Sequence, residues 1–206
     1  MKILSFTTGP LGVNSYLVFV EGEKSAILID AGGDINKIHH YAESNGVVIS
    51  HLLLTHGHFD HVGAAAELQR EGCIVYLHEN DWSKVQTSEG LCGFSGFSVP
   101  TFTPDFVVQD GDVLELAGLK IKVLHTPGHT SGSVCYIIEN VIFSGDTLFS
   151  RSFGRTDLGD GSIRALANSI VNKIFALNGN FRVCPGHEGE SELDFERKVN
   201  PILYYV

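Results

Sequence analysis

The chain has 206 residues, of which 43% are hydrophobic and 18% charged, a composition typical of a folded domain and too apolar for a disordered segment. Its formal net charge of −10 opposes binding to phosphate backbones and anionic lipids, so we expect no nucleic acid and no membrane partner. We expect a single domain over residues 1–206, as a monomer or a small homo-oligomer.

The first residues and the cysteines indicate a cytoplasmic protein. Residues 1–10 lack the apolar stretch of a secretory signal, and no apolar run approaches the roughly 20 residues that span a bilayer. The four cysteines form no C-x-x-C pair, so we expect free thiols. Cys135 and Cys184 are expected in the core, and Cys92 is expected to be the most exposed.

In the first half of the chain, the pattern predicts strands alternating with helices. Two apolar runs, 16–20 and 26–30, are separated by a polar turn and predict a hairpin. Apolar residues at three- and four-residue spacing predict a helix from about residue 35, which ends at Asn45 and Gly46. The next elements expected are a strand at 49–54, a helix at 64–70 and a strand at 74–77.

In the second half, residues 82–106 contain glycines and prolines among polar and aromatic residues, which predicts a loop-rich interval. The elements expected after it are strands at 112–116, 120–124, 133–138 and 140–143, a helix at 162–178, a strand at 181–184 and a helix at 192–199. Strands with helices interspersed in both halves predict two mixed sheets that face each other, with helices outside.

A dense group of ligand-type side chains follows the predicted strand 49–54. His56, His58, Asp60 and His61 lie within six residues. At the end of a strand they place nitrogen and oxygen donors in one small volume, which suits Zn, Fe or Mn. A single histidine is more often an ordinary surface or core residue, but this crowding is costly unless a cation holds the group together. The segment therefore predicts a metal site.

Three further residues of the same kind also follow predicted strands. They are His129, Asp146 and His187. If these strands share one orientation, their loops meet at one edge of the fold, where binding groups usually gather on a rigid scaffold. A glycine precedes each of them and permits a sharp turn of the backbone; these are Gly128, Gly145 and Gly186.

The ordered set H-x-H-x-D-H, P-G-H-T, G-D and G-H resembles the metallo-β-lactamase fold superfamily, from about Asp30 to His187. The resemblance implies an α/β fold, a four-layer αββα sandwich with the metals at one edge of the two sheets. It implies two divalent metals, with Zn expected first and Fe or Mn as alternatives. The implied ligands are His56, His58 and His129 for one metal, Asp60, His61 and His187 for the other, and Asp146 as the bridge.

Within that superfamily the chain is similar to the short glyoxalase II-like hydrolases, through residues 154–157 (G-R-T-D) and 200–203 (N-P-I-L). The similarity implies hydrolysis of a small-molecule thioester or ester, as in hydroxyacylglutathione hydrolases, by attack of a metal-bridging hydroxide on the carbonyl. Asp60 and Asp146 are the implied catalytic residues, together with the metal-bound water. Full glyoxalase II has a further C-terminal helical domain that grips glutathione. Because the similarity here is to the short form, it does not imply lactoylglutathione as the natural substrate.

Particular residues argue for or against other activities of the same fold. A persulfide dioxygenase also has H-x-H-x-D-H and G-R-T-D but uses one Fe(II), whereas His187 favours two metals here. A flavodiiron-type reductase would need a glutamate in place of His58. Asp60 and residues 154–157 argue against a true β-lactamase, and the acidic surface argues against a nuclease.

Several residues near the motifs have two interpretations. Asp30 is expected either to accept a hydrogen bond from a ligand imidazole or to cap the helix that follows. Thr55 and Thr130 are expected either to orient neighbouring ligands or to make ordinary turn hydrogen bonds. Arg155 and Asp157 are expected to form an ion pair near the site.

For the remaining aromatic residues and histidines, a structural role is the main expectation. The phenylalanines of the loop-rich interval are expected to form its own small core, with the wall of a substrate pocket as the alternative; they are Phe94, Phe97, Phe102 and Phe106. The histidines outside the motif positions are expected on helix surfaces or in the core; they are His39, His40, His51, His78 and His125.

Overall fold

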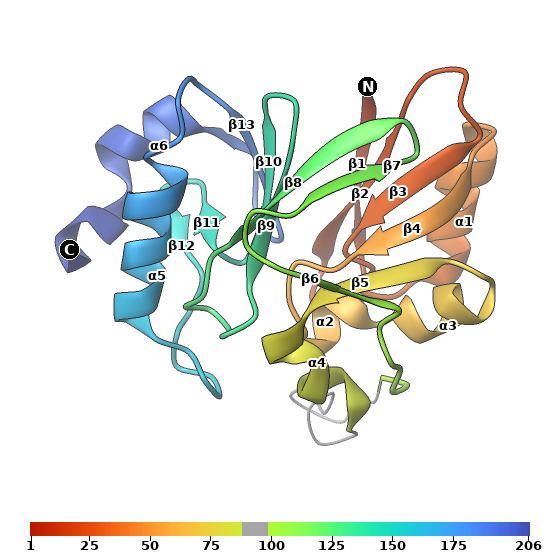
Figure 1. Ribbon diagram of the computed structural model, residues 1–206, viewed down its shortest axis with the longest axis horizontal. Coiled ribbons are helices and arrows are strands. Elements are labelled where there is room, and N and C mark those ends of the chain that lie inside the picture. Colours follow the sequence, from red (N-terminus) through yellow and green to blue (C-terminus); the bar gives the residue numbers. More distant parts are fainter. Residues whose placement is uncertain (88–98) are drawn as a thin grey trace.

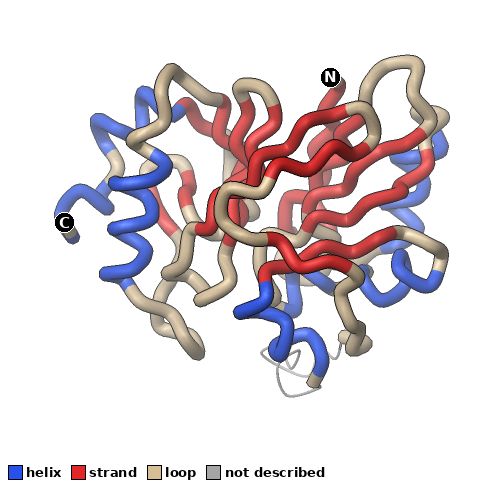
Figure 2. The backbone as a smooth tube through the Cα atoms, in the orientation of Figure 1, coloured by secondary structure: helices blue, strands red, loops and turns tan. Residues whose placement is uncertain are grey.

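Two six-stranded sheets face each other, and helices cover their outer faces (Figures 1 and 2). This arrangement is seen in a computed structural model, which describes residues 1–87 and 99–206. It is the four-layer αββα sandwich implied by the resemblance, and the predicted fold class is confirmed. None of the helices in the described ranges is long and apolar enough to cross a bilayer.

The first sheet contains the N-terminal strands in chain order. Its members are β1 (Lys2–Thr8), β2 (Val13–Phe19), β3 (Ser25–Ile29), β4 (Val48–Leu53), β5 (Ile74–His78) and β6 (Phe106–Val108). The predicted hairpin is β2–β3, and β3 to β6 run parallel. Strand β1 was not predicted. It is an edge strand with several exposed residues, so its burial pattern is weak, and it is specified by pairing with β2 along its whole length.

The second sheet has the order β14-β13-β10-β9-β8-β7. Its strands are β7 (Val113–Leu116), β8 (Leu119–His125), β9 (Val134–Ile138), β10 (Val141–Gly145), β13 (Arg182–Pro185) and β14 (Ser191–Glu192). Because β9 is antiparallel to both β8 and β10, and β10 is parallel to β13, the strands β8, β10 and β13 point the same way. A small hairpin, β11 (Leu148–Phe149) and β12 (Ser152–Phe153), follows β10 directly.

Helices lie on the outer face of each sheet (Figure 1). Those that follow strands of the first sheet are α1 (Ile35–Ser44), α2 (Phe59–Val62), α3 (Ala65–Arg70) and α4 (Glu79–Gln86). Those in the second half are α5 (Ile163–Ser169), the π-helix η2 (Ile170–Ile174), α6 (Leu193–Val199) and the 3₁₀ helix η3 (Pro201–Tyr205).

The structure corrects two predicted boundaries, one of the loop-rich interval and one of a helix. The loop-rich interval was predicted from residue 82, but residues 82–86 belong to α4, which the His78 side chain caps by accepting from the Asn80 N–H. The helix predicted over 162–178 ends earlier, because a π turn with a hydrogen bond from Phe175 N to Ile170 O follows α5.

The core has three apolar layers, one between the sheets and one beneath the helices on each side. In β2 and β3, Leu17 and Leu28 pack under the first helices while Tyr16 and Ile27 pack against the second sheet. Strands buried on both faces have nearly continuous apolar runs, as the sequence shows here. The cysteines Cys73, Cys135 and Cys184 are free and buried, as expected, and Cys92 lies outside the described residues.

Candidate metal centre

The ends of several strands bring the seven predicted ligands together. His129, Asp146 and His187 follow β8, β10 and β13, the three strands that point the same way, and the remaining ligands follow β4. Asp60 and His61 lie in the single turn of α2. Donor atoms within 4.8 Å of one another form three overlapping sets: His56, His58 and His129; His56, His61 and Asp146; Asp60, His61 and His187.

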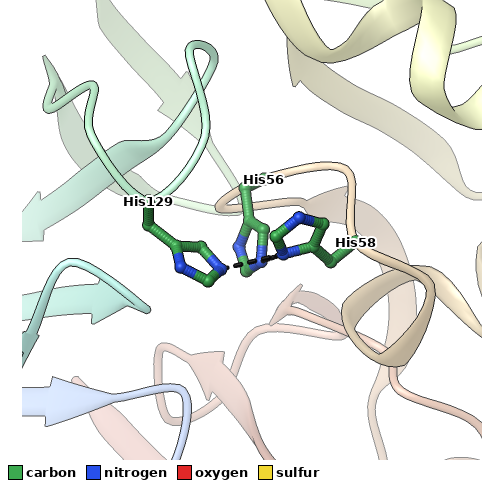
Figure 3. Close-up of side chains that lie close together, drawn as sticks. All are labelled: His56, His58 and His129. Atoms are coloured by element: carbon green, nitrogen blue, oxygen red, sulfur yellow. Dashed lines mark hydrogen bonds between the residues drawn. The ribbon is translucent and has the colours of Figure 1, made fainter. Parts of the chain in front are cut away.

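The first set consists of three imidazoles that point toward one another from two loops (Figure 3). His56 Nε2 lies 3.1 Å from His58 Nδ1, which lies 2.8 Å from His129 Nε2. The three rings are close to perpendicular, with interplanar angles of 85–89°. Three imidazole nitrogens converging on one point are a common donor set for a divalent metal.

The carboxylate of Asp146 lies between the first set and the group Asp60, His61 and His187, which forms the second set. Its Oδ1 is 3.3 Å from His61 Nε2, while its Oδ2 is 3.5 Å from His129 Nε2. On the second side, His187 Nε2 lies 3.3 Å from Asp60 Oδ2. Asp146 therefore has one oxygen beside each group of ligands.

Two buried atoms in the cluster test whether a metal fits. His61 Nε2 and Asp146 Oδ1 are buried and have no hydrogen-bond partner among the described residues, although they are 3.3 Å apart. Leaving a buried polar atom unpaired costs about 1–3 kcal/mol, and native structures rarely tolerate it. A cation placed between these atoms would satisfy both, so the residues fit a divalent metal.

Asp30 sets the orientation of two ligand histidines. Its Oδ2 accepts from His61 Nδ1 at 2.8 Å and from the Thr55 hydroxyl at 2.8 Å. Since the Thr55 proton is directed to Asp30, its oxygen is free to accept from His56 Nδ1 at 3.1 Å. Both histidines then present Nε2 to the cluster. The first interpretation of Asp30 is confirmed, and the cap position of α1 belongs to Asp34.

His129 is oriented by a backbone group that the sequence did not reveal. Its Nδ1 donates to the carbonyl oxygen of Arg155 at 2.8 Å, which turns Nε2 toward the cluster. The Arg155 side chain forms the predicted ion pair, with Nε and Nη2 at 2.7 and 2.8 Å from the two oxygens of Asp157. Both side chains of that pair are largely exposed, which limits its contribution to stability.

Asp81 was also missed. This fully buried carboxylate of α4 accepts from Gly57 N at 2.8 Å, from Thr130 Oγ1 at 2.7 Å and from Gly132 N at 3.0 Å, and it pairs with Lys84. Gly57 and Thr130 lie in the two loops that supply the first ligand set. Among the described residues, the Thr130 side chain bonds to Asp81 and Ser133 and to no predicted ligand, so it orients its loop through Asp81. Asp81 holds the two loops together.

Two glycines allow the loops to approach closely. Gly145 has a φ of 48°, and a Cβ there would overlap the Thr55 side chain. A Cβ on Gly186 would overlap Asp146 Oδ1 and crowd the His61 ring. Glycine is required at both positions because the backbone passes against Thr55 at Gly145 and against two predicted ligands at Gly186, in addition to any sharp turn.

Burial and neighbouring charges set the protonation of the cluster. Burial, with the other histidines nearby, lowers the pKa of His56 well below its usual value and that of His58 to about 4. Burial alone would raise the pKa of Asp60, but His61 and His187 outweigh it and lower that pKa. Burial also opposes charge on His61, yet Asp146, Asp30 and Asp60 raise its pKa well above the usual value. The carboxylates thus create a strongly cation-attracting site.

A cleft of about 830 Å³ opens onto the cluster. Besides ligands, its lining includes Leu11, Phe59, Phe149, Ser152, Phe153, Arg155, Leu158 and Glu188. The alternative role for the loop phenylalanines is not seen where they are described. Phe102 is buried in the core, and Phe106 stacks on Tyr76, while Phe94 and Phe97 lie outside the described residues. The five other histidines are not in the cluster, and His78 and His125 stack on each other at 4.0 Å.

A two-sheet sandwich with a histidine and aspartate cluster at one edge defines a class of metal-dependent proteins. The sequence model of the Metallo-beta-lactamase superfamily matches residues 8–187, and the chain belongs to this superfamily. Metal-dependent hydrolysis and divalent-metal binding are properties of the superfamily that the His/Asp cluster fits. The chain is 34% identical to the hydroxyacylglutathione hydrolase GloC of Haemophilus influenzae, with 89% of each protein covered.

Solved structures show the same fold. BLEG-1, described as a B3 metallo-β-lactamase, is 33% identical with a TM-score of 0.91, and the match covers 98% of this chain and 99% of that one. A di-iron form of TTHA1623 is 34% identical with a TM-score of 0.83, covering 96% and 98%. ETHE1 from Myxococcus xanthus is 26% identical with a TM-score of 0.82, covering 98% and 84%. The likeness to BLEG-1 weakens the argument against a β-lactamase.

Proposed function

We propose that the chain is a dinuclear metal-dependent hydrolase that cleaves small-molecule thioesters. The main support is the position of Asp146, whose oxygens lie 3.3 Å from His61 Nε2 and 3.5 Å from His129 Nε2, so that one carboxylate reaches both ligand sets. A mononuclear site does not need such a bridge. The similarity to GloC supports a thioester as the substrate.

The ligand assignment in this proposal follows the three sets. One metal would be held by His56, His58 and His129, the other by Asp60, His61 and His187, and both by Asp146. Two divalent metals in such a centre lower the pKa of a bound water to about 7 and polarise a carbonyl. We propose zinc for both positions, with iron or manganese as alternatives, since the nitrogen-rich first set suits zinc and TTHA1623 binds two irons.

The chain's own groups would prepare the reaction. The carboxylates of Asp60 and Asp146 have lowered pKa values and stay ionised, so they can accept hydrogen bonds from the attacking water and orient it. His56 and His61 keep their Nδ1 protons on Thr55 and Asp30 and act as ligands. The cleft above the cluster would hold the substrate with its carbonyl over the centre.

A second candidate is a persulfide dioxygenase, which the likeness to ETHE1 and the G-R-T-D stretch at residues 154–157 favour. That activity uses one iron, with positions left open for oxygen. The position of Asp146 and the second ligand set argue for two metals. A β-lactamase is the third candidate, on the likeness to BLEG-1.

The test is metal content per chain by elemental analysis, with three assays on the same sample. The assays are hydrolysis of S-acyl glutathione thioesters, oxygen uptake with glutathione persulfide, and hydrolysis of a chromogenic β-lactam. Two metals per chain with thioester cleavage as the dominant activity is the expected result. One iron per chain with oxygen uptake and no hydrolysis would replace this proposal by the dioxygenase, and dominant β-lactam cleavage would replace it by the lactamase.

A further inference from the structure

We propose that the thioester substrate has an apolar acyl group, which packs on an apolar wall beside the metal centre formed by Phe149, Phe153 and Leu158; this rests on the proposed hydrolase function. All three residues line the cleft and are half-buried. They expose apolar surface to solvent directly beside the cluster, and covering such surface is favourable.

The wall is fixed in place by the fold. Phe149 and Phe153 belong to the β11–β12 hairpin, which begins two residues after Asp146. The Phe149 ring lies 6.3 Å from the His187 ring and perpendicular to it. Phe153 packs edge-on against Tyr205 of η3 at 5.6 Å. Phe149 is therefore next to His187, and both phenylalanines are carried by a hairpin joined closely to the Asp146 loop.

Two further apolar residues, from the first half of the chain, also line the cleft. Leu11, in the turn between β1 and β2, lines the cleft and is 53% exposed. Phe59, at the start of α2, lies between His58 and Asp60 in the chain and also lines the cleft. An acyl chain that enters the cleft would thus contact apolar side chains from both halves of the sandwich.

The charges of the cleft do not favour a strongly anionic or hydroxylated acyl group. Among the described residues, Arg155 is the only lysine or arginine in the lining, and its guanidinium is already paired with both oxygens of Asp157. Glu188 adds a carboxylate to the lining, and the whole chain has a net charge of −10. Away from the predicted ligands, Ser152 carries the one side-chain hydroxyl among the described lining residues. Apolar contact is what this cleft supplies.

The test holds the leaving thiol constant and changes only the acyl group. Wild-type protein loaded with metal is assayed with S-acetyl-, S-butyryl-, S-hexanoyl- and S-lactoylglutathione. The apolar wall predicts that kcat/KM rises by up to about fourfold for each methylene that becomes buried, and by at least about tenfold from acetyl to hexanoyl. S-lactoylglutathione is expected to be a poorer substrate than S-butyrylglutathione.

Single substitutions test whether the selectivity for long acyl groups arises at the apolar wall. Phe149→Ala and Leu158→Ala are expected to lower the ratio of hexanoyl to acetyl kcat/KM at least about threefold, because each removes part of the buried contact. Phe106→Ala is the matched control, since Phe106 is 54% exposed, stacks on Tyr76 and does not line the cleft. Metal content is measured for every variant, so that a loss of metal is separated from a loss of acyl contact.

The outcomes are distinguishable. If kcat/KM of the wild type does not change with acyl length, or is highest for S-lactoylglutathione, the proposal of an apolar acyl group is wrong. The proposed thioesterase activity would be unaffected by that result. A steep series that is unchanged in Phe149→Ala and Leu158→Ala would overturn the placement on this wall. No hydrolysis of any member by protein with two metals per chain would overturn the proposed function and this inference with it.

Discussion

Asp81→Asn tests whether a buried carboxylate that is not a ligand supports the metal centre. In the native chain, Oδ2 accepts from Gly57 N and Thr130 Oγ1, while Oδ1 accepts from Gly132 N and pairs with Lys84. An asparagine has the same shape but only one acceptor oxygen. Whichever way the amide is oriented, its NH₂ group faces two donors.

The loss of stability in Asp81→Asn follows from the backbone and side-chain donors that lose their acceptor. Each buried donor without an acceptor costs about 1–3 kcal/mol, or about 2–6 kcal/mol for two. The Thr130 hydroxyl can turn to Ser133 Oγ at 2.8 Å and recover one hydrogen bond. When the amide oxygen faces Gly132 and Lys84, only the Gly57 N–H then lacks an acceptor, so we expect the free energy of unfolding to fall by about 1–3 kcal/mol. Loosening of the two ligand loops is expected to weaken metal binding at the first set by about 10–100-fold.

Urea unfolding and competition with a chelator measure the two effects. Asp160→Asn is the matched control, because Asp160 also pairs with Lys84 and accepts from Ser131 N but is 38% exposed. That change is expected to cost no more than about 1 kcal/mol. An Asp81→Asn protein with native metal affinity and a free energy of unfolding within about 0.5 kcal/mol of wild type would refute the role given to Asp81.

Three further substitutions separate the ligand roles. Asp146→Ala is expected to lose most metal and activity together, because its oxygens face both sets; near-normal metal content by elemental analysis would contradict the bridge. His187→Ala is expected to lose about one metal per chain with an unchanged circular dichroism spectrum, since its side chain is 25% exposed and the first set stays complete. Asp30→Asn is expected to weaken metal binding about 10–100-fold in chelator competition, because it disturbs the tautomers of His61 and His56; unaltered affinity would contradict this.

The sequence predicted those features that depend on local pattern. The strands of the hairpin β2–β3 have apolar residues on both faces, so their runs are visible without knowing their partners. The ligands follow strands and have glycines beside them, which made their convergence predictable once the strands were placed in parallel. Local pattern was enough for the layers of the fold and for the position of the cluster.

Features that depend on distant partners were not predictable in the same way. Apart from Lys84 on the same helix, the partners of Asp81 lie 24 to 51 residues away along the chain, so nothing in its own segment marks it as a link between loops. The Arg155 carbonyl that orients His129 is a backbone group and leaves no trace in the residue pattern. Strand β1 is specified by its pairing with β2, and the wall of Phe149 and Phe153 by a hairpin of two-residue strands, too short for a periodic signal.

Two buried carboxylates, Asp30 and Asp81, hold different parts of the predicted ligand cluster in place. Asp30 ties the end of β3 to Thr55 and His61, and Asp81 ties α4 to the loops of the first set. With these residues held in place, the proposed metal centre would offer the same chemistry to any carbonyl that reaches it. Discrimination between substrates must then arise where the chain contacts the rest of the molecule, in the lining of the cleft. This explains how relatives described as a hydroxyacylglutathione hydrolase and as a β-lactamase share one fold, and why the residues of the cleft are the place to change specificity.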